Sequence, residues 1–227
     1  KEYEFVPSHN KVYNITTGEV WTKIDDTTIY GNTGNGAFKY GYFEVKAKLA
    51  RGKGMHSSFW LFAQRGGEKH EIDIFEASHH GFFPIYAENT GNPPTGNQHT
   101  TNFSTCVHRS HSKGGKVDDA LPKGHAISNH DNRGLSNTWN TYAVEWTPYE
   151  ITWYFNNREV RSLKSTDLME NLGINDFHPL RLVLSLGYEN RLNQDSPLES
   201  QMEIEYVRVY QKDKYKDKPN IYGSTQV

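Results

Sequence analysis

Three acidic side chains stand close together in the stretch EIDIFE, residues 71–76. On a β-strand Glu71 and Asp73 share one face, because side chains two positions apart point the same way, and the isoleucines beside them point into the core. Glu76 is five positions from Glu71, so a regular strand would bury it. One extra residue near Phe75, a β-bulge, would return Glu76 to the face of the other two acids.

Crowding three carboxylates raises the pKa of at least one of them, which then keeps its proton near neutral pH. A retaining glycosidase needs such a set: one ionised carboxylate as nucleophile and one protonated carboxyl as acid, about 5–5.5 Å apart. Neighbours on one strand face are roughly 6.5–7 Å apart at Cα, so the outer side chains must lean together over Asp73. The spacing therefore points to hydrolysis of a glycosidic bond.

The same acids, with His70, His79 and His80 beside them, also admit a metal site. Carboxylate oxygens suit calcium, and imidazole nitrogens suit a transition metal. The spacing, however, matches no zinc motif such as H-E-x-x-H. We therefore expect no metal and no cofactor in the chemistry of this stretch.

Alternation of apolar and polar residues with period two indicates β-strands with one buried face. The clearest examples lie at residues 42–49, 151–155, 181–186 and 202–210. Asn156-Asn157 predicts a hairpin turn after the second of these strands. One short helix is expected at residues 166–173, with Thr166 as its cap and Gly173 as its end. Many short strands between Gly and Asn turns predict an all-β fold, a sandwich of two antiparallel sheets.

The chain of 227 residues fits one domain, and no linker or internal repeat divides it. We predict a single catalytic β-sandwich over residues 1–227, with a polar tail at 212–227. Residues 81–133 are rich in Gly, Pro, Asn, His and Ser, and long loops in a compact domain are usually functional. Because they follow the acids directly, we expect them to form one wall of a binding cleft.

Composition excludes several classes of partner. The formal net charge is −2, whereas a nucleic-acid-binding protein usually carries a basic stripe. No run approaches the roughly 20 apolar residues of a membrane helix, and no signal peptide is visible. The single cysteine, Cys106, allows no internal disulfide. Aromatic residues make up 13% of the chain, which suits sugar-binding surfaces and tyrosine-rich sheets equally well.

Several motifs, in their order along the chain, resemble glycoside hydrolase family 16, the group of laminarinases, lichenases, agarases, porphyranases and κ-carrageenases. They are KYGYFEVKAKL (39–49), GKGMHSSFWL (52–61), EIDIFE (71–76), TYAVEW (141–146) with ITWYF (151–155), and EYVRVY (205–210). Together they span roughly residues 35–211. The bulged E-x-D-x-x-E signature together with the other motifs is specific evidence for the resemblance, whereas any one motif alone is weak evidence.

The resemblance implies a β-jelly-roll sandwich that carries the acids on a concave sheet, where a substrate cleft lies. It implies an endo-acting retaining β-glycosidase with Glu71 as nucleophile, Glu76 as general acid/base, and Asp73 between them to tune their protonation. By this resemblance the chain lacks the family's first strand, and because that strand often helps to form a structural calcium site, we assign no calcium. We expect a monomer that acts on a polysaccharide and is secreted, periplasmic or at the cell surface.

The resemblance and the polar loops also suggest residues that contact the sugar. The candidates for substrate binding are Trp60, His56, His108, Arg109, Trp146, Glu189 and Arg191. Trp153 is expected in the core instead, because Ile151 and Phe155 share its face. For an acidic sugar the candidate ligands are Arg65, Arg109, Arg133 and Arg191, since the guanidinium fork binds sulfate with two hydrogen bonds.

Departures from the family pattern bear on the substrate. The tryptophan-proline pair of laminarinases is replaced by residues 65–70, and a segment rich in glycine and tryptophan is replaced by residues 186–192. Both usually shape glucan subsites, so their loss favours a β-galactan, agar-, porphyran- or carrageenan-like. The alternatives are an endo-β-1,3(4)-glucanase, a carbohydrate-binding sandwich without catalysis, and transglycosylation, which a retaining mechanism leaves open.

Overall fold

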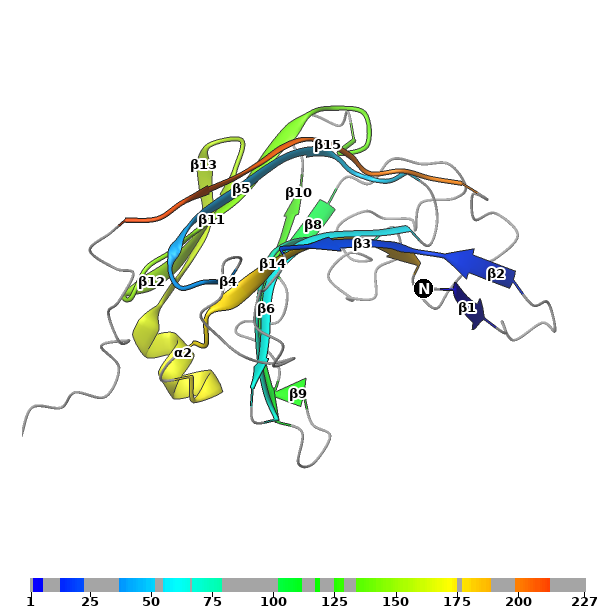
Figure 1. Ribbon diagram of the computed structural model, residues 1–227. Coiled ribbons are helices and arrows are strands. Elements are labelled where there is room, and N and C mark those ends of the chain that lie inside the picture. The colour runs from blue at the N-terminus through cyan, green and yellow to red at the C-terminus, as the bar shows by residue number, and fades with distance from the viewer. Residues whose placement is uncertain are drawn as a thin grey trace, which may run out of the picture.

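The computed structural model describes eleven stretches of the chain, and every structural statement below concerns them. They are residues 2–5, 13–22, 37–51, 55–65, 67–78, 102–111, 117–118, 125–128, 134–174, 177–188 and 199–212. Nearly all belong to antiparallel strands, in two sheets that pack face to face (Figure 1). The predicted all-β sandwich is confirmed.

The larger sheet has eight strands and carries the acidic stretch. Its main path runs in the order β10-β8-β7-β6-β14-β3, with β4 paired to β14 and β9 paired to β8. The strands are β3 (Gly18–Trp21), β4 (Ala37–Phe38), β6 (Met55–Arg65), β7 (Glu68–Ser78), β8 (Asn102–His111), β9 (Val117–Asp118), β10 (His125–Ser128) and β14 (Leu180–Tyr188). Strands β8, β9 and β10 lie in the region predicted as a loop wall, so part of that region extends the sheet.

The smaller sheet has five strands in the order β13-β12-β11-β5-β15. They are β5 (Gly41–Lys48), β11 (Asn140–Trp146), β12 (Glu150–Phe155), β13 (Arg158–Lys164) and β15 (Glu203–Tyr210). Asn156 and Asn157 turn β12 into β13 with positive φ angles of 48° and 62°, as the predicted hairpin requires. Strands β1 (Glu2–Phe5) and β2 (Tyr13–Thr16) form a separate pair.

The core lies between the two sheets. Phe59 and Leu61 of the larger sheet and Val144 and Trp153 of the smaller one are fully buried there. The long strands of the larger sheet bend strongly, and the smaller sheet lies outside the bend (Figure 1). The other face of the larger sheet, which carries Glu71, is therefore the inner side of the bend; we call it the acid face.

The single helix of the described residues, α2 (Ser165–Leu172), begins one residue before the predicted start. The prediction of Thr166 as its cap is wrong, because Lys164 takes the capping position and the Asp167 carboxylate accepts the backbone N–H of Lys164 at 2.9 Å. Gly173 ends the helix at φ 60°, as predicted. No helix among the described residues is long and apolar enough to cross a membrane.

Candidate active site

The β-bulge predicted from the spacing of the acids is present in β7. On β6, Phe59 lies opposite Phe75, and Trp60 lies opposite Asp73, so Ile74 has no partner. The pairing with β8 shifts at the same place, between Asp73 and Glu76. The extra residue thus lies next to the predicted one, and both Ile74 and Phe75 are buried in the core.

The middle acid is the most deeply buried of the three. Asp73 is 1% exposed, whereas Glu71 and Glu76 are partly accessible. Burial, reinforced by the negative charges of Glu76 and Glu71, holds the pKa of Asp73 well above its usual range. Burial also raises the pKa of Glu71, against the opposing charge of His108. A side-chain hydrogen bond joins Glu71 and Asp73, so in the free protein these two carboxyls share a proton.

Glu76 has a histidine beside it. Nε2 of His56 lies 3.4 Å from Oε1 of Glu76, and both side chains are about a quarter exposed, at 26% and 23%. Burial pushes the pKa of Glu76 upward, but the hydrogen bond and charge of His56, with the charge of His108, bring the pKa below its usual value. The pKa of Glu76 is therefore lowered, whereas the pKa values of Glu71 and Asp73 are raised.

A second histidine closes the other side of the acid row. His108 lies on β8 opposite Glu71, and its Nε2 is 3.1 Å from Oδ2 of Asp73. Burial lowers the pKa of His108, but contact with Cys106 and the charges of Glu71 and Glu76 together raise it to about 9. His108 is therefore a cation at neutral pH, and it offsets part of the negative charge of the acids.

The opposite sheet supports the acid strand through its main chain. Trp153 of β12 donates its indole N–H to the carbonyl oxygen of Asp73 at 2.8 Å, in the buried core. Arg161 of β13 stacks over that indole, 4.8 Å from the ring centroid, and donates to the carbonyl oxygen of Thr105 at 2.6 Å. Both contacts lie under the acid face, so the core fixes where the backbones of β7 and β8 run.

Polar and aromatic side chains continue the acid face across β6 and β14. The hydroxyls of Ser58 and Ser185 are 2.6 Å apart, and the indole N–H of Trp60 donates to Ser185 at 3.2 Å. Trp60 also meets Phe62 edge to face at 5.3 Å between ring centroids. A partly exposed indole with its N–H held is a suitable surface for a sugar ring.

The family whose sequence model matches the chain is described as "Glycosyl hydrolases family 16", and the match covers residues 1–208. The chain belongs to glycosyl hydrolase family 16. The resemblance seen in its motifs is confirmed, and the bulged acid strand of this structure is the part of the chain that carries the E-x-D-x-x-E signature.

Two curated relatives are similar to the chain. The "Endo-1,3-1,4-beta-glycanase ExsH" of Rhizobium meliloti is 24% identical over 177 residues, 77% of this chain and 31% of the relative. The "Beta-glucanase" of Rhodothermus marinus is 24% identical over 193 residues, 78% of this chain and 59% of the relative. The chain thus spans about a third and about three fifths of the lengths of these relatives.

Solved structures share the fold at low identity. The laminarinase catalytic domain of Thermotoga maritima matches with a TM-score of 0.58 and 22% identity, over 78% of this chain and 65% of that one. A family 16 protein of Bacteroides ovatus, in complex with a mixed-linkage glucan product, matches at 0.60 and 16%, over 91% and 78%. The κ-carrageenase of Zobellia galactanivorans matches at 0.56 and 18%, over 88% and 81%. These likenesses support the jelly-roll sandwich.

Of the predicted sugar contacts, the structure places three on the acid face of this family 16 chain: His56, Trp60 and His108. Their roles in binding stay predictions. Glu189 and Arg191 lie outside the described residues, as do Arg133 and the side chain of Arg65.

The prediction for Trp146 is wrong. This indole is 1% exposed and packs in the core against Tyr40 and Phe177, at 5.0 and 5.4 Å between ring centroids. Its strand, β11, is central in the smaller sheet. Trp153 is buried as predicted.

The prediction for Arg109 is also wrong. Arg109 follows His108 on β8, so it points to the opposite face of the sheet from the acids. Its Nε donates to Oε1 of Glu68 at 2.6 Å, and its Nη1 donates to the carbonyl oxygens of Leu172 and Gly173 at 2.7 and 2.8 Å. Arg109 therefore binds the end of α2 to the sheet rather than a sugar.

Two groups of side chains have donor atoms close enough to hold a metal ion. They are Glu68, His70 and His178, and Asp73, Cys106 and His108. In the first group Arg109 already donates to Oε1 of Glu68, the oxygen nearest to His70. In the second, Asp73 and Cys106 are buried, and Nε2 of His108 lies 3.1 Å from Oδ2 of Asp73. The prediction of a reaction without metal stays a prediction.

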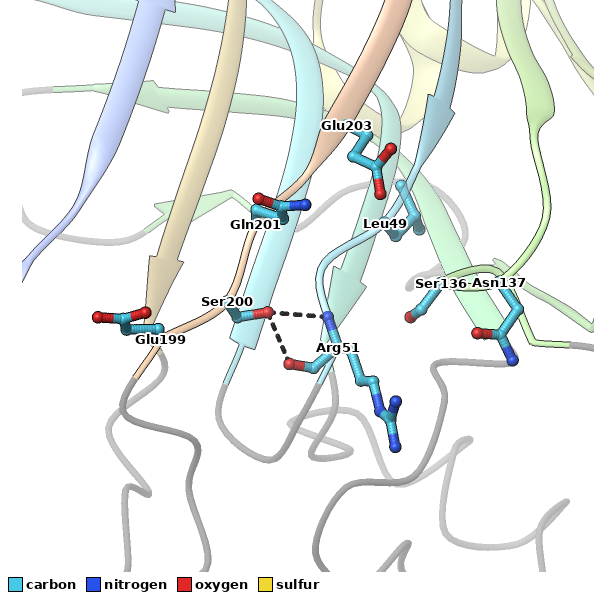
Figure 2. Close-up of a pocket in the computed structure, with 8 residues that line it drawn as sticks. All are labelled: Leu49, Arg51, Ser136, Asn137, Glu199, Ser200, Gln201 and Glu203. Atoms are coloured by element: carbon cyan, nitrogen blue, oxygen red, sulfur yellow. Dashed lines mark hydrogen bonds between the residues drawn. The ribbon is translucent and has the colours of Figure 1, made fainter.

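A pocket of about 390 Å³ lies at one end of the smaller sheet (Figure 2), and none of the three acids lines it. The end of β5, the turn at Ser136 and the stretch before β15 form it. Ser200 lines it, and its hydroxyl accepts from the backbone N–H of Arg51 and donates to the carbonyl oxygen of the same residue. No predicted site residue lines this pocket.

The sequence missed three residues of the acid face: Trp21 on β3, Phe62 on β6 and Arg181 on β14. Arg181 lies opposite Phe62, which lies opposite Glu71. The alternation of β6 and β14 could have shown this, because Phe62 shares the parity of Trp60, and Arg181 shares that of Ser185.

Proposed function

We propose that this protein is an endo-acting, retaining β-glycosidase that hydrolyses a polysaccharide. One observation carries the proposal: the bulge of β7 brings Glu71, Asp73 and Glu76 to a single accessible face, between two histidines. A sugar-binding module has no need of three crowded acids, which cost stability unless their protonation is used.

Glu71 is the nucleophile that attacks the anomeric carbon, and Glu76 protonates the leaving oxygen and later activates water. Asp73 donates a hydrogen bond to Glu71 from its retained proton, and His108 adds positive charge on the same side. These two contacts lower the pKa of Glu71 and so favour its carboxylate form, whereas burial raises the pKa.

The free protein favours an ionised Glu76, whereas the reaction requires a protonated one. A bound sugar excludes water from Glu76 and so favours the protonated form that the reaction requires, since desolvation raises the pKa of a carboxyl group. His56 opposes the change, so the position of this imidazole sets how readily Glu76 takes its proton.

For the substrate we favour a β-galactan. The tryptophan-rich segments of glucan-specific relatives are replaced in this sequence, and the acid face instead presents Trp60, Phe62 and a guanidinium from Arg181. The second candidate is a β-1,3(4)-glucan, which the names of both curated relatives favour. Polymers of either kind are met outside the cell, so we place the protein in a secreted, periplasmic or cell-surface location, as a monomer.

The experiment is a reducing-end assay on laminarin, barley β-glucan, agarose, porphyran and κ-carrageenan. Wild type should release new ends from one class of polymer, and Glu71→Gln and Glu76→Gln should each lose that activity. Glu145→Gln is the matched control, because Glu145 pairs with Lys212 on the smaller sheet, away from the acids. If both acid variants cleaved like the wild type, the proposal would fail. Retention on a polymer without cleavage would indicate a binding module.

A further inference from the structure

Arg181 has an unusual environment on the acid face. Its guanidinium lies 4.4 Å from the ring centroid of Trp21 and 5.4 Å from that of Phe62, so aromatic rings from β3 and β6 flank it. Trp21 is 52% exposed, and its cross-strand partner on β14, Val183, is fully buried. The two rings hold the guanidinium in place, because cation–π contacts restrict both its position and its tilt.

No hydrogen bond within the described part of the chain uses the guanidinium of Arg181. Its Nε is buried and has no acceptor, and among the described residues no carboxylate forms an ion pair with it. Burial lowers the pKa of Arg181, and the charge of Glu19 on β3 opposes this shift. A buried N–H without an acceptor costs free energy, so such a group is usually satisfied by a ligand or has a function.

Arg181 lies two strands away from Glu71, the proposed nucleophile, on the same face of the sheet. Arg181, Phe62 and Glu71 are cross-strand neighbours on β14, β6 and β7. Strands are about 4.8 Å apart, so the backbone of Arg181 lies about 10 Å from that of Glu71. A sugar chain bound over Glu71 therefore brings a neighbouring sugar within reach of the guanidinium.

We propose that Arg181 binds an acidic substituent of the substrate, a sulfate ester or a carboxylate, on a sugar close to the cleaved bond. The inference rests on the proposed function and narrows its substrate to an anionic polysaccharide. The N–H groups of the guanidinium edge match two oxygens of such a substituent. The substituent would also accept a hydrogen bond from the buried Nε and form an ion pair with the guanidinium.

The acids make this cation necessary for an anionic substrate. Glu71 and Glu76 repel a sulfate or carboxylate, and a neutral sugar suffers no such repulsion. Arg181 places a positive charge at one end of the row, whereas His56 and His108 lie beside the acids themselves. A neutral substrate would leave the desolvation of Arg181 uncompensated.

The test compares κ-carrageenan, the same polymer after chemical desulfation, and a β-linked polyuronate. Wild type should prefer one anionic polymer over its neutral counterpart by about 10- to 100-fold in kcat/KM, the range expected for hydrogen bonds to charged groups. Arg181→Met should abolish this preference, and Arg181→Lys should keep part of it. Preference for the sulfated polymer identifies a sulfate, and preference for the polyuronate identifies a carboxylate.

Arg158→Met is the control, because Arg158 is exposed at the start of β13 on the other sheet. Thermal unfolding of each variant checks that it folds. Equal hydrolysis of native and desulfated polymer by wild type, with kcat/KM unchanged in Arg181→Met, would overturn the inference and leave the proposed function standing. If wild type cleaves nothing, affinity electrophoresis of Glu71→Gln with and without Arg181→Met decides: retention by κ-carrageenan that Arg181→Met leaves intact also overturns it.

Discussion

Trp153→Phe is expected to destabilise the protein by about 2–4 kcal/mol. The substitution keeps an aromatic ring under Arg161 but removes the N–H that donates to the carbonyl oxygen of Asp73 at 2.8 Å. A buried carbonyl left without a donor costs about 1–3 kcal/mol. The smaller ring also leaves a void in a core where Trp153 is fully buried, which adds about 1 kcal/mol.

Urea and thermal unfolding measure this loss, and the melting temperature should fall by about 4–16 °C, since 1 kcal/mol corresponds to about 2–4 °C in a chain of this size. Trp139→Phe is the matched control, because that indole is 38% exposed and contacts Lys48 at the surface. We expect the control to change stability by less than about 0.5 kcal/mol. A loss in Trp153→Phe no larger than in the control would show that the indole does not anchor the acid strand.

Three further substitutions test other contacts. His56→Gln should move the alkaline limb of the kcat/KM profile to higher pH, because His56 lowers the pKa of Glu76 and its loss lets that acid keep its proton longer; an unmoved limb would contradict the pairing. The pKa of His108 is raised to about 9, so the stability that protonated His108 contributes is fully present below about pH 6.5 and is lost as the pH rises through 9. Between these pH values the free energy of unfolding of wild type should fall by about 1–3 kcal/mol more than that of His108→Gln. Equal pH dependence in the two proteins would refute the assignment. Gly173→Ala should cost at least about 1 kcal/mol in urea unfolding, because φ is 60° and a Cβ would lie 2.7 Å from a guanidinium nitrogen, whereas Gly18→Ala has open space and should be near neutral.

The acid site could be predicted from sequence because it depends on local parity. Five positions separate Glu71 from Glu76, and only a bulge places both on one face, so the irregularity follows from the spacing itself. The strands were found for the same reason, since alternation is a property of neighbouring residues. The single catalytic domain over residues 1–227 stays a prediction.

The errors arose where a side chain's role depends on the opposite sheet. Trp146 and Trp60 look alike in sequence, yet Trp146 is buried in the core, whereas Trp60 is partly exposed on the acid face. Arg109 follows a residue of the acid face and was assigned to it, but its partner is the end of α2, 63 residues further along the chain. The Arg181 environment was missed because Trp21 and Phe62 come from distant segments that only the sheet order brings together.

The most direct test of the account is the stereochemistry of the first product. Proton NMR should follow wild type acting on the polymer that it cleaves best in the panel, with Glu71→Gln as control. We expect the β-anomer to appear first and to convert slowly to the equilibrium mixture, because a glycosyl intermediate on Glu71 retains the configuration. Initial release of the α-anomer, or an unchanged rate in Glu71→Gln, would contradict the assignment of Glu71 as the nucleophile.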